Sequence, residues 1–323
     1  MIELLPISEN PLVDVEFHEN FKLLEKLMKQ EKYKDGLRQA LVFAEKYLNR
    51  STEFYSWALE FCQALEDSNE TLVLLEQAIT NGAWWSADFL KLAYGELFAD
   101  NEKFDRLLQL AVKNTPSKKM KAKLIVRTPE KYDLTKSYPL LLVLHGRGSN
   151  VEHSDKIWKS ETVKRNMIVG FLQSSQLLSS VHYCWDDWEK AFIDIKAAYK
   201  TLTSKYTINN EKSIIGGVSA GAEVGLSALF EHILPFSKMI STITSTGTFI
   251  RNYIEKDKTN ESLEVFFIVG EKDVRYNNTK LIHQYLKKTS LSSEFYSCPK
   301  IGHEIPNNFD EILEKAVTYL NVK

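Results

Sequence analysis

The stretch Ser213-Ile214-Ile215-Gly216-Gly217-Val218-Ser219-Ala220-Gly221 decides how the second half of this chain is interpreted. β-Branched residues lead into a Gly-x-Ser-x-Gly pentapeptide, and a helix-forming run over 222–231 follows. This order predicts a strand, a sharp turn and a helix. Because Gly217 and Gly221 carry no side chain, the strand and the helix can approach closely. The serine at the tip of such a turn presents its hydroxyl group beside the backbone N–H groups of a helix N-terminus.

Strand patterns recur on both sides of this stretch. The run Leu140–Leu144 is continuously apolar, which is typical of a strand buried on both faces. The predicted strands lie at 121–127, 140–144, 167–172, 213–217, 239–243, 265–269 and 295–298, and the predicted helices between or after them lie at 188–202, 222–233, 277–288 and 309–320. Such alternation predicts a mostly parallel sheet with helices on both faces.

The first third of the chain has a helical pattern instead. Apolar residues recur at spacings of three and four from about residue 17 to 112. Leu37, Leu72 and Leu107 lie in similar short segments, and each is 35 residues from the next. This period resembles that of tetratricopeptide-type helix pairs. Proline, serine and lysines cluster at 113–119, where the helical pattern stops, and indicate a linker.

These patterns predict an arm at 1–16, a helical-repeat (tetratricopeptide-like) domain at 17–115 and an α/β domain at 116–323. Repeats of this kind present a concave surface. The helical domain therefore either holds a protein or ligand partner or braces its neighbour, and the sequence leaves both open. The pair Trp84-Trp85 is better explained by packing in a core or between domains than by ligand stacking.

Composition excludes several classes of function. The 323 residues carry a formal net charge of −2, so no bulk attraction to nucleic acid or to an anionic membrane is expected. The cysteines, at 62, 184 and 298, show no metal-binding or disulfide spacing. The N-terminus lacks a signal-peptide pattern, and the apolar runs are too short to span a bilayer. No nucleotide or metal motif is present. We therefore expect a cytoplasmic protein without a membrane span, cofactor or metal.

From about residue 120 to the end, the chain resembles the α/β-hydrolase superfamily. Within it, the closest likeness is to small serine esterases of the carboxylesterase, feruloyl-esterase and polyhydroxyalkanoate-depolymerase type. Four stretches carry the resemblance: the strand and His-Gly loop at 138–148, the elbow at 217–221, the strand end at 268–273 and the histidine loop at 301–303. The resemblance implies an α/β-hydrolase fold with residues 116–323 as the catalytic domain, and the helical pattern predicts an all-α helical-repeat domain before it.

Ser219, Asp273 and His303 follow one another in the nucleophile–acid–base order of this superfamily. Each follows a predicted strand, and the carboxyl ends of parallel strands meet at one edge of a sheet. A histidine can take the serine proton near neutral pH, and a carboxylate can orient that histidine. Two rival acids are less suitable, because Asp257 precedes the relevant strand and Glu271 is upstream of the matching position.

The loop after Leu144 is the predicted oxyanion loop. The backbone N–H of Ala220 and, by the resemblance, that of Arg147 would form the oxyanion hole. The Arg147 side chain would either meet an acidic substrate group or, as we favour, hold the loop through a salt bridge. His145 is expected to brace the loop rather than to act in catalysis.

Gly146, Gly148 and Trp185 are the predicted substrate-binding residues. For Trp185, lining the site and packing at the start of a helix capped by Asp186 or Asp187 are equally compatible with the sequence. The connection 244–264 is short for a lid, so the helical domain is a candidate cover.

The predicted function is hydrolysis of a small-molecule carboxylic ester through a Ser-His-Asp triad and an acyl-enzyme intermediate. A thioesterase, or a peptidase or amidase, of the same fold would use the same residues. The alternative from another class is a non-catalytic binding protein that uses the helical-repeat domain.

Overall fold

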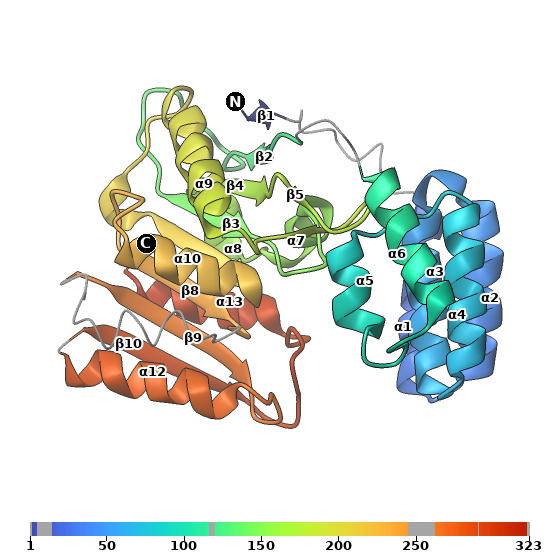
Figure 1. The fold of residues 1–323 in the computed structure, drawn as a ribbon. Coiled ribbons are helices and arrows are strands. Elements are labelled where there is room, and N and C mark those ends of the chain that lie inside the picture. Colours follow the sequence, from blue (N-terminus) through green and yellow to red (C-terminus); the bar gives the residue numbers. More distant parts are fainter. Residues whose placement is uncertain (1, 5–14, 116–119, 245–261, 290, 322–323) are drawn as a thin grey trace. The chain divides into compact units, whose positions relative to one another are not determined.

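The computed structural model describes residues 2–4, 15–115, 120–244, 262–289 and 291–321 (Figure 1). The described residues form two compact units. The sheet unit comprises those within 1–7, 120–176 and 183–323, and the helical unit comprises those within 8–119 and 177–182. The predicted domain boundaries stay predictions, because 5–14 and 116–119 lie outside the described residues.

An eight-stranded sheet organises the sheet unit, with the strand order β1-β2-β4-β3-β7-β8-β9-β10. Its strands are β1 (Glu3–Leu4), β2 (Lys123–Arg127), β3 (Leu140–Leu144), β4 (Ile168–Gln173), β7 (Ile214–Val218), β8 (Lys238–Thr242), β9 (Glu264–Gly270) and β10 (Ser292–Cys298). The pairs are parallel except β2 with β4, which is antiparallel. A further two-stranded pair joins β5 (Gln176–Leu177) and β6 (Tyr183–Cys184).

Helices cover both faces of this sheet. On one face, α9 (Trp188–Thr203), α10 (Ala220–Phe230) and α12 (Tyr276–Lys288) pack on a core that contains Leu142, Ile215 and Phe267. On the other face, α7 (Val151–Ile157), α8 (Glu161–Asn166) and α13 (Phe309–Tyr319) pack on a core that contains Leu141 and Ile268. Neighbouring residues of a strand point to opposite faces, so both helical layers need apolar partners. This requirement explains the continuously apolar strands that the sequence shows.

The helical unit contains the first six helices, coloured blue to green in Figure 1. They are α1 (Val15–Lys29), α2 (Tyr33–Lys46), α3 (Ser51–Ala64), α4 (Ser68–Thr80), α5 (Ala87–Tyr94) and α6 (Glu102–Asn114). Helices α2, α4 and α6 begin at residues 33, 68 and 102. Their apolar faces share one core, which includes Phe54, Leu75 and Trp85. Within the described residues, no helix is both long and apolar enough to cross a membrane.

Candidate functional site

The turn between β7 and α10 forces Ser219 into an unusual backbone conformation, with φ 52° and ψ −117°. Such angles are strained for a residue with a side chain and are found where a functional group must be presented. Two glycines make the turn sterically possible. A Cβ atom on Gly217 would lie 2.5 Å from the Gly221 carbonyl oxygen, and one on Gly221 would lie 2.3 Å from the His145 carbonyl oxygen. The predicted strand–turn–helix arrangement at 213–221 is therefore confirmed.

Ser219, His303 and Asp273 form a chain of hydrogen bonds. The Ser219 hydroxyl lies 2.9 Å from His303 Nε2, and His303 Nδ1 lies 2.7 Å from Asp273 Oδ2. The three residues differ in burial: Ser219 is half-buried, the His303 side chain is 33% exposed and the Asp273 side chain is fully buried. The structure thus brings together three predicted residues from the ends of different strands.

Backbone hydrogen bonds fix the loops that carry Asp273 and His303. Lys272 N–H donates to the Ile301 carbonyl oxygen at 2.9 Å, and Glu271 N–H donates to that of Cys298 at 3.0 Å. Gly270 allows this approach, because a Cβ atom there would lie 2.3 Å from the Gly302 carbonyl oxygen. The two loops are therefore tied together directly at the end of β9.

Among the described residues, no backbone carbonyl accepts from the backbone N–H of Ala220 or from that of Arg147. Gly146 sits beside the serine, since a Cβ atom on it would be 3.8 Å from Ser219 Cβ. Gly148 has a φ of 73°, and its N–H donates to the Tyr183 carbonyl oxygen at 2.9 Å, so this N–H is already used.

The His145 side chain holds the loop after Leu144 through hydrogen bonds of both ring nitrogens. Its ring is fully buried; Nδ1 lies 2.7 Å from the Gly146 carbonyl oxygen, and Nε2 accepts from Ser174 N–H at 3.2 Å. Burial lowers the pKa of His145 to about 4, although the hydrogen bond to Gly146 opposes that shift. A neutral ring with its proton on Nδ1 satisfies both contacts. This geometry agrees with a bracing role.

The side chains of Arg147 and Trp185 both form hydrogen bonds that hold the loop after Leu144. The Arg147 guanidinium donates to both carboxylate oxygens of Asp186, each at 3.1 Å, as the favoured salt-bridge interpretation requires. Trp185 is 2% exposed, and its indole N–H donates to the His145 carbonyl oxygen at 2.8 Å. Asp187, rather than Asp186, caps α9. The burial of Trp185 favours packing under the loop over contact with a substrate.

Sequence analysis did not identify three residues that form hydrogen bonds at the site. Arg275 N–H donates to Asp273 Oδ1 at 2.9 Å, and its guanidinium lies 3.4 Å from His303 Nδ1. Ser174 supplies the N–H that His145 accepts, and the Thr242 carbonyl oxygen accepts from Ser219 N–H at 2.9 Å. The only available signal was the close spacing of Asp273 and Arg275, because the other two contacts use backbone atoms. The rival acid Asp257 and most of the 244–264 connection lie outside the described residues.

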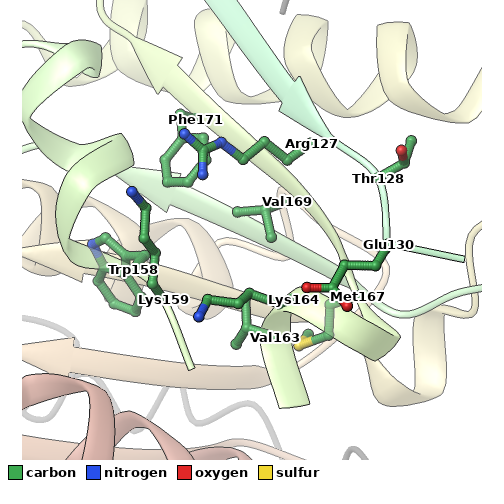
Figure 2. Close-up of a pocket in the computed structure, with 10 residues that line it drawn as sticks. All are labelled: Arg127, Thr128, Glu130, Trp158, Lys159, Val163, Lys164, Met167, Val169 and Phe171. Carbon is green, nitrogen blue, oxygen red and sulfur yellow. The ribbon is translucent and has the colours of Figure 1, made fainter. Parts of the chain in front are cut away.

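The sheet unit contains a cavity of about 460 Å³ (Figure 2). It lies beside the start of β4, where Arg127 pairs with Val169, and so at the strand ends opposite to Ser219. Burial and the neighbouring Arg127 lower the pKa of Lys159, which lines it. The other cations are paired, Arg127 with Asp155 and Lys164 with Glu161. This cavity contains no nucleophile–base pair, and among the described residues no group of His, Cys, Asp and Glu is arranged to hold a metal ion.

Comparisons with known proteins show the fold. No family model and no curated protein matches the chain. A crystal structure of an uncharacterized protein from Bacillus cereus is 21% identical, with a TM-score of 0.51, and the match covers 94% of this chain and 98% of that one. Esterase PE8 is 15% identical, with a TM-score of 0.49 over 63% of this chain and 99% of its own. Est1E from Butyrivibrio proteoclasticus, with ferulic acid bound, is 13% identical, with a TM-score of 0.49 over 62% of this chain and 95% of its own.

The likeness to the Bacillus cereus protein extends over nearly the whole chain and shows a shared fold. In the structure itself, a mostly parallel sheet is flanked by helices and follows an N-terminal helical region. The serine turn lies at the carboxyl end of the central strand β7. The predicted α/β class, a mostly parallel sheet flanked by helices after an all-α region, is confirmed, and the repeat character of that region stays a prediction.

Proposed function

We propose that this chain is a serine hydrolase that cleaves carboxylic esters through Ser219, His303 and Asp273. The observation that carries the proposal is the hydrogen-bonded chain from the strained Ser219 through His303 to the buried Asp273. A serine hydroxyl is a weak nucleophile until a neighbouring base accepts its proton. The arrangement supplies such a base and a carboxylate that orients it.

In the proposed reaction, Ser219 Oγ attacks the ester carbonyl carbon while its proton passes to His303 Nε2. The carbonyl oxygen becomes an oxyanion, which accepts hydrogen bonds from the N–H groups of Ala220 and Arg147. The bond to the alcohol oxygen then breaks, and the alcohol leaves with the proton from His303. Water repeats these steps on the acyl-enzyme, so that a carboxylic acid is released and the serine is restored. Asp273 keeps the imidazole oriented and stabilises its cationic form.

Hydrolysis of p-nitrophenyl acetate, butyrate and octanoate by the wild type and by Ser219→Ala tests the proposal. We expect wild-type turnover and a loss of at least about 10⁴-fold in the variant, since removing the nucleophile removes the covalent route. A fluorophosphonate probe should label the wild type alone. Similar rates in the two proteins, with no labelling, would favour the non-catalytic alternative.

The ester preference is tested separately from the mechanism. The wild type receives three substrates with the same acyl group: a p-nitrophenyl ester, an acyl thioester and a p-nitroanilide. The proposal expects the highest kcat/KM for the ester. A higher value for the thioester or the anilide would retain Ser219 as nucleophile and replace the substrate class.

For the helical unit we propose a short tetratricopeptide-like array that serves as a partner- or ligand-holding module. The starts of α2, α4 and α6 are 35 and 34 residues apart, close to the period of such repeats. A cytoplasmic location also stays a prediction, drawn from the cysteine pattern and the sequence of the N-terminus.

A further inference from the structure

The cavity beside the start of β4 lies at the strand ends opposite to Ser219, and the proposed ester hydrolysis uses none of its residues. Its volume of about 460 Å³ falls within the range of small-molecule pockets, about 300–1,000 Å³. All of its lining residues belong to the sheet unit. The cavity can therefore be considered as a second small-molecule site, separate from the serine.

The indole N–H of Trp158, a lining residue, is a hydrogen-bond donor without a partner. The side chain is 1% exposed, and Nε1 has no hydrogen-bond partner among the described residues. The ring is packed tightly, because a Cβ atom on Gly216 would lie 2.7 Å from it and Phe309 contacts it edge-on, with ring centroids 5.3 Å apart. A buried donor without an acceptor is costly, and in native proteins such a group often meets a water molecule or a ligand.

Lys159, the next residue, brings a positive charge to the same side of the cavity (Figure 2). Its side chain is half-buried, and its ammonium group forms no ion pair within the part of the chain that the structure describes. Burial, followed by the charge of Arg127, lowers the pKa of Lys159, whereas Asp155 opposes that shift. An anion beside this ammonium group would offset both its lost hydration and the repulsion from Arg127.

The remaining charges favour an anion with a single charge. The ion pairs already present are Arg127–Asp155 and Lys164–Glu161. Glu130 is exposed, and in Figure 2 its carboxylate lies across the cavity from Lys159. A dianion such as phosphate would be repelled by Glu130 and would find the Arg127 guanidinium already paired. A monoanion needs only the one cation that is left.

Apolar side chains form the inner wall of the cavity. They are Val163, Met167, Val169 and Phe171, each 4% exposed or less. Small-molecule pockets typically combine such a wall with a few polar groups that fix the orientation of the ligand. Here the apolar wall would hold the body of a ligand, and the neighbouring donors of Trp158 and Lys159 would hold its charged end.

We propose that this cavity binds a small monocarboxylate, whose carboxylate accepts hydrogen bonds from the Trp158 indole N–H and the Lys159 ammonium group. A carboxylate has two acceptor oxygens, so one group can serve both donors. The apolar body of the ligand packs against the inner wall. The inference goes beyond the proposed function, because no step of the ester hydrolysis involves this cavity.

Isothermal titration calorimetry of the full chain with sodium benzoate tests the inference, because benzoate joins a carboxylate to a compact apolar ring. We expect one saturable site. Benzamide has nearly the same shape without the charge and should bind at least about tenfold more weakly, since charge-assisted hydrogen bonds are roughly twice as strong as neutral ones. Binding of benzoate to Ser219→Ala should match the wild type, so a failure of the proposed function leaves this test intact.

Two lysine variants locate the binding. Lys159→Met keeps the apolar stem and removes the charge, so the Kd for benzoate should rise by about tenfold or more. Lys164→Met, the matched control, removes a lysine of the same cavity that is exposed and already paired, and should change the Kd by less than about threefold. Thermal unfolding checks that both variants are folded.

NMR of the protein with ¹⁵N-labelled tryptophan tests the role of Trp158. One of the six indole N–H signals should shift with benzoate, at the Kd found by calorimetry, and at the same benzoate concentrations the shift should be absent in Lys159→Met. The inference is overturned if no site with a Kd below about 10 mM is found, if folded Lys159→Met binds as tightly as the wild type, or if no indole signal shifts. Equal binding of benzamide, or tighter binding of inorganic phosphate, would overturn the assignment to a monocarboxylate.

Discussion

The two sides of the Ser219 site are held in place in different ways. On the histidine side, the loops carrying Asp273 and His303 contribute side chains, and backbone hydrogen bonds within the sheet unit tie them together. On the oxyanion side, the loop contributes backbone N–H groups, and side chains such as His145 and Asp186 hold it. The histidine side is thus supported by backbone hydrogen bonds, whereas on the oxyanion side the side chains add to the backbone hydrogen bonds that Gly148 and Ser149 make with Tyr183.

This difference determines how far a substitution reaches. A substitution on the histidine side removes a chemical group directly. A substitution on the oxyanion side leaves the N–H donors in place and alters only their position. We therefore expect large, sharply localised effects on the first side and smaller, graded effects on the second.

Asp273→Asn, on the histidine side, should have the largest effect. The amide can favour the wrong histidine tautomer while leaving the geometry intact, and in a serine protease with such a triad the same change lowers kcat by about 10⁴-fold. Steady-state kinetics on p-nitrophenyl butyrate measure it. The matched control is Glu271→Gln, which alters the neighbouring rival acid and should retain near wild-type kcat. A reversed ranking would move the acid role to Glu271.

Gly221→Ala tests the elbow that both sides share. Its Cβ atom would meet backbone carbonyl oxygens at 2.3 and 2.6 Å, so β3 and α10 would have to separate. We expect kcat to fall by roughly 10²-fold, because both N–H donors shift relative to Ser219. Gly225→Ala, in the same helix, is the control. Its Cβ atom would meet only side-chain atoms of Met239 and Ile215, at 3.3 Å or more.

If Gly225→Ala lowered kcat as much as Gly221→Ala, the close approach of β3 and α10 at the elbow would not be the cause of the lower kcat. Kinetics should be accompanied by thermal unfolding of each variant. Overpacking of this kind typically costs about 1–3 kcal/mol of folding free energy, so a stable but slow Gly221→Ala protein is the most informative outcome.

The sequence predicted the strands and the three candidate triad residues better than the long-range contacts around them. Strand 140–144 was predicted with its observed bounds, and 213–217 was predicted one residue early, because apolar runs and glycines mark buried parallel strands. The positions of Ser219, Asp273 and His303 followed from the same pattern. The pairing of residues 178–180 with 84–86 left no such mark. It uses backbone atoms far apart in the sequence, and backbone hydrogen bonds impose no residue type.

Lowering the pH should reduce the stability of the folded protein through His145, the residue that holds the oxyanion loop. The unfolded chain protonates this residue near its ordinary pKa of 6.5, whereas burial holds the folded value at about 4. Between those values the unfolded state binds more protons, so stability falls as the pH is lowered from 6.5 to 4. The slope contributed by one histidine is at most about 1.4 kcal/mol per pH unit. Above pH 6.5 this contribution is fully present and constant.

Urea unfolding of the wild type and of His145→Asn, at several pH values from 7 to 4.5, measures this contribution. The variant should be less stable at pH 7 but show a shallower loss on acidification. If stability fell with pH at the same rate in both proteins, His145 would be protonated at the same pH in the folded and unfolded states. That result would contradict a neutral, buried His145 ring in the folded protein.

Substitution of Arg147 should have the smallest effect on kcat. It also distinguishes the two roles considered for this side chain, holding the loop and binding an acidic substrate group. Its pair with Asp186 is partly exposed, and such pairs are worth up to about 1 kcal/mol, equivalent to about fivefold. If the side chain only holds the loop, Arg147→Lys and Asp186→Asn should lower kcat by similar factors of about two to five on a neutral ester. The same factors should apply to an ester that carries a carboxylate on its acyl group. A larger loss for Arg147→Lys on the acidic ester alone, with no matching loss in Asp186→Asn, would instead assign the guanidinium to substrate recognition. That result would give the oxyanion side a side-chain role of the kind so far proposed only for the histidine side.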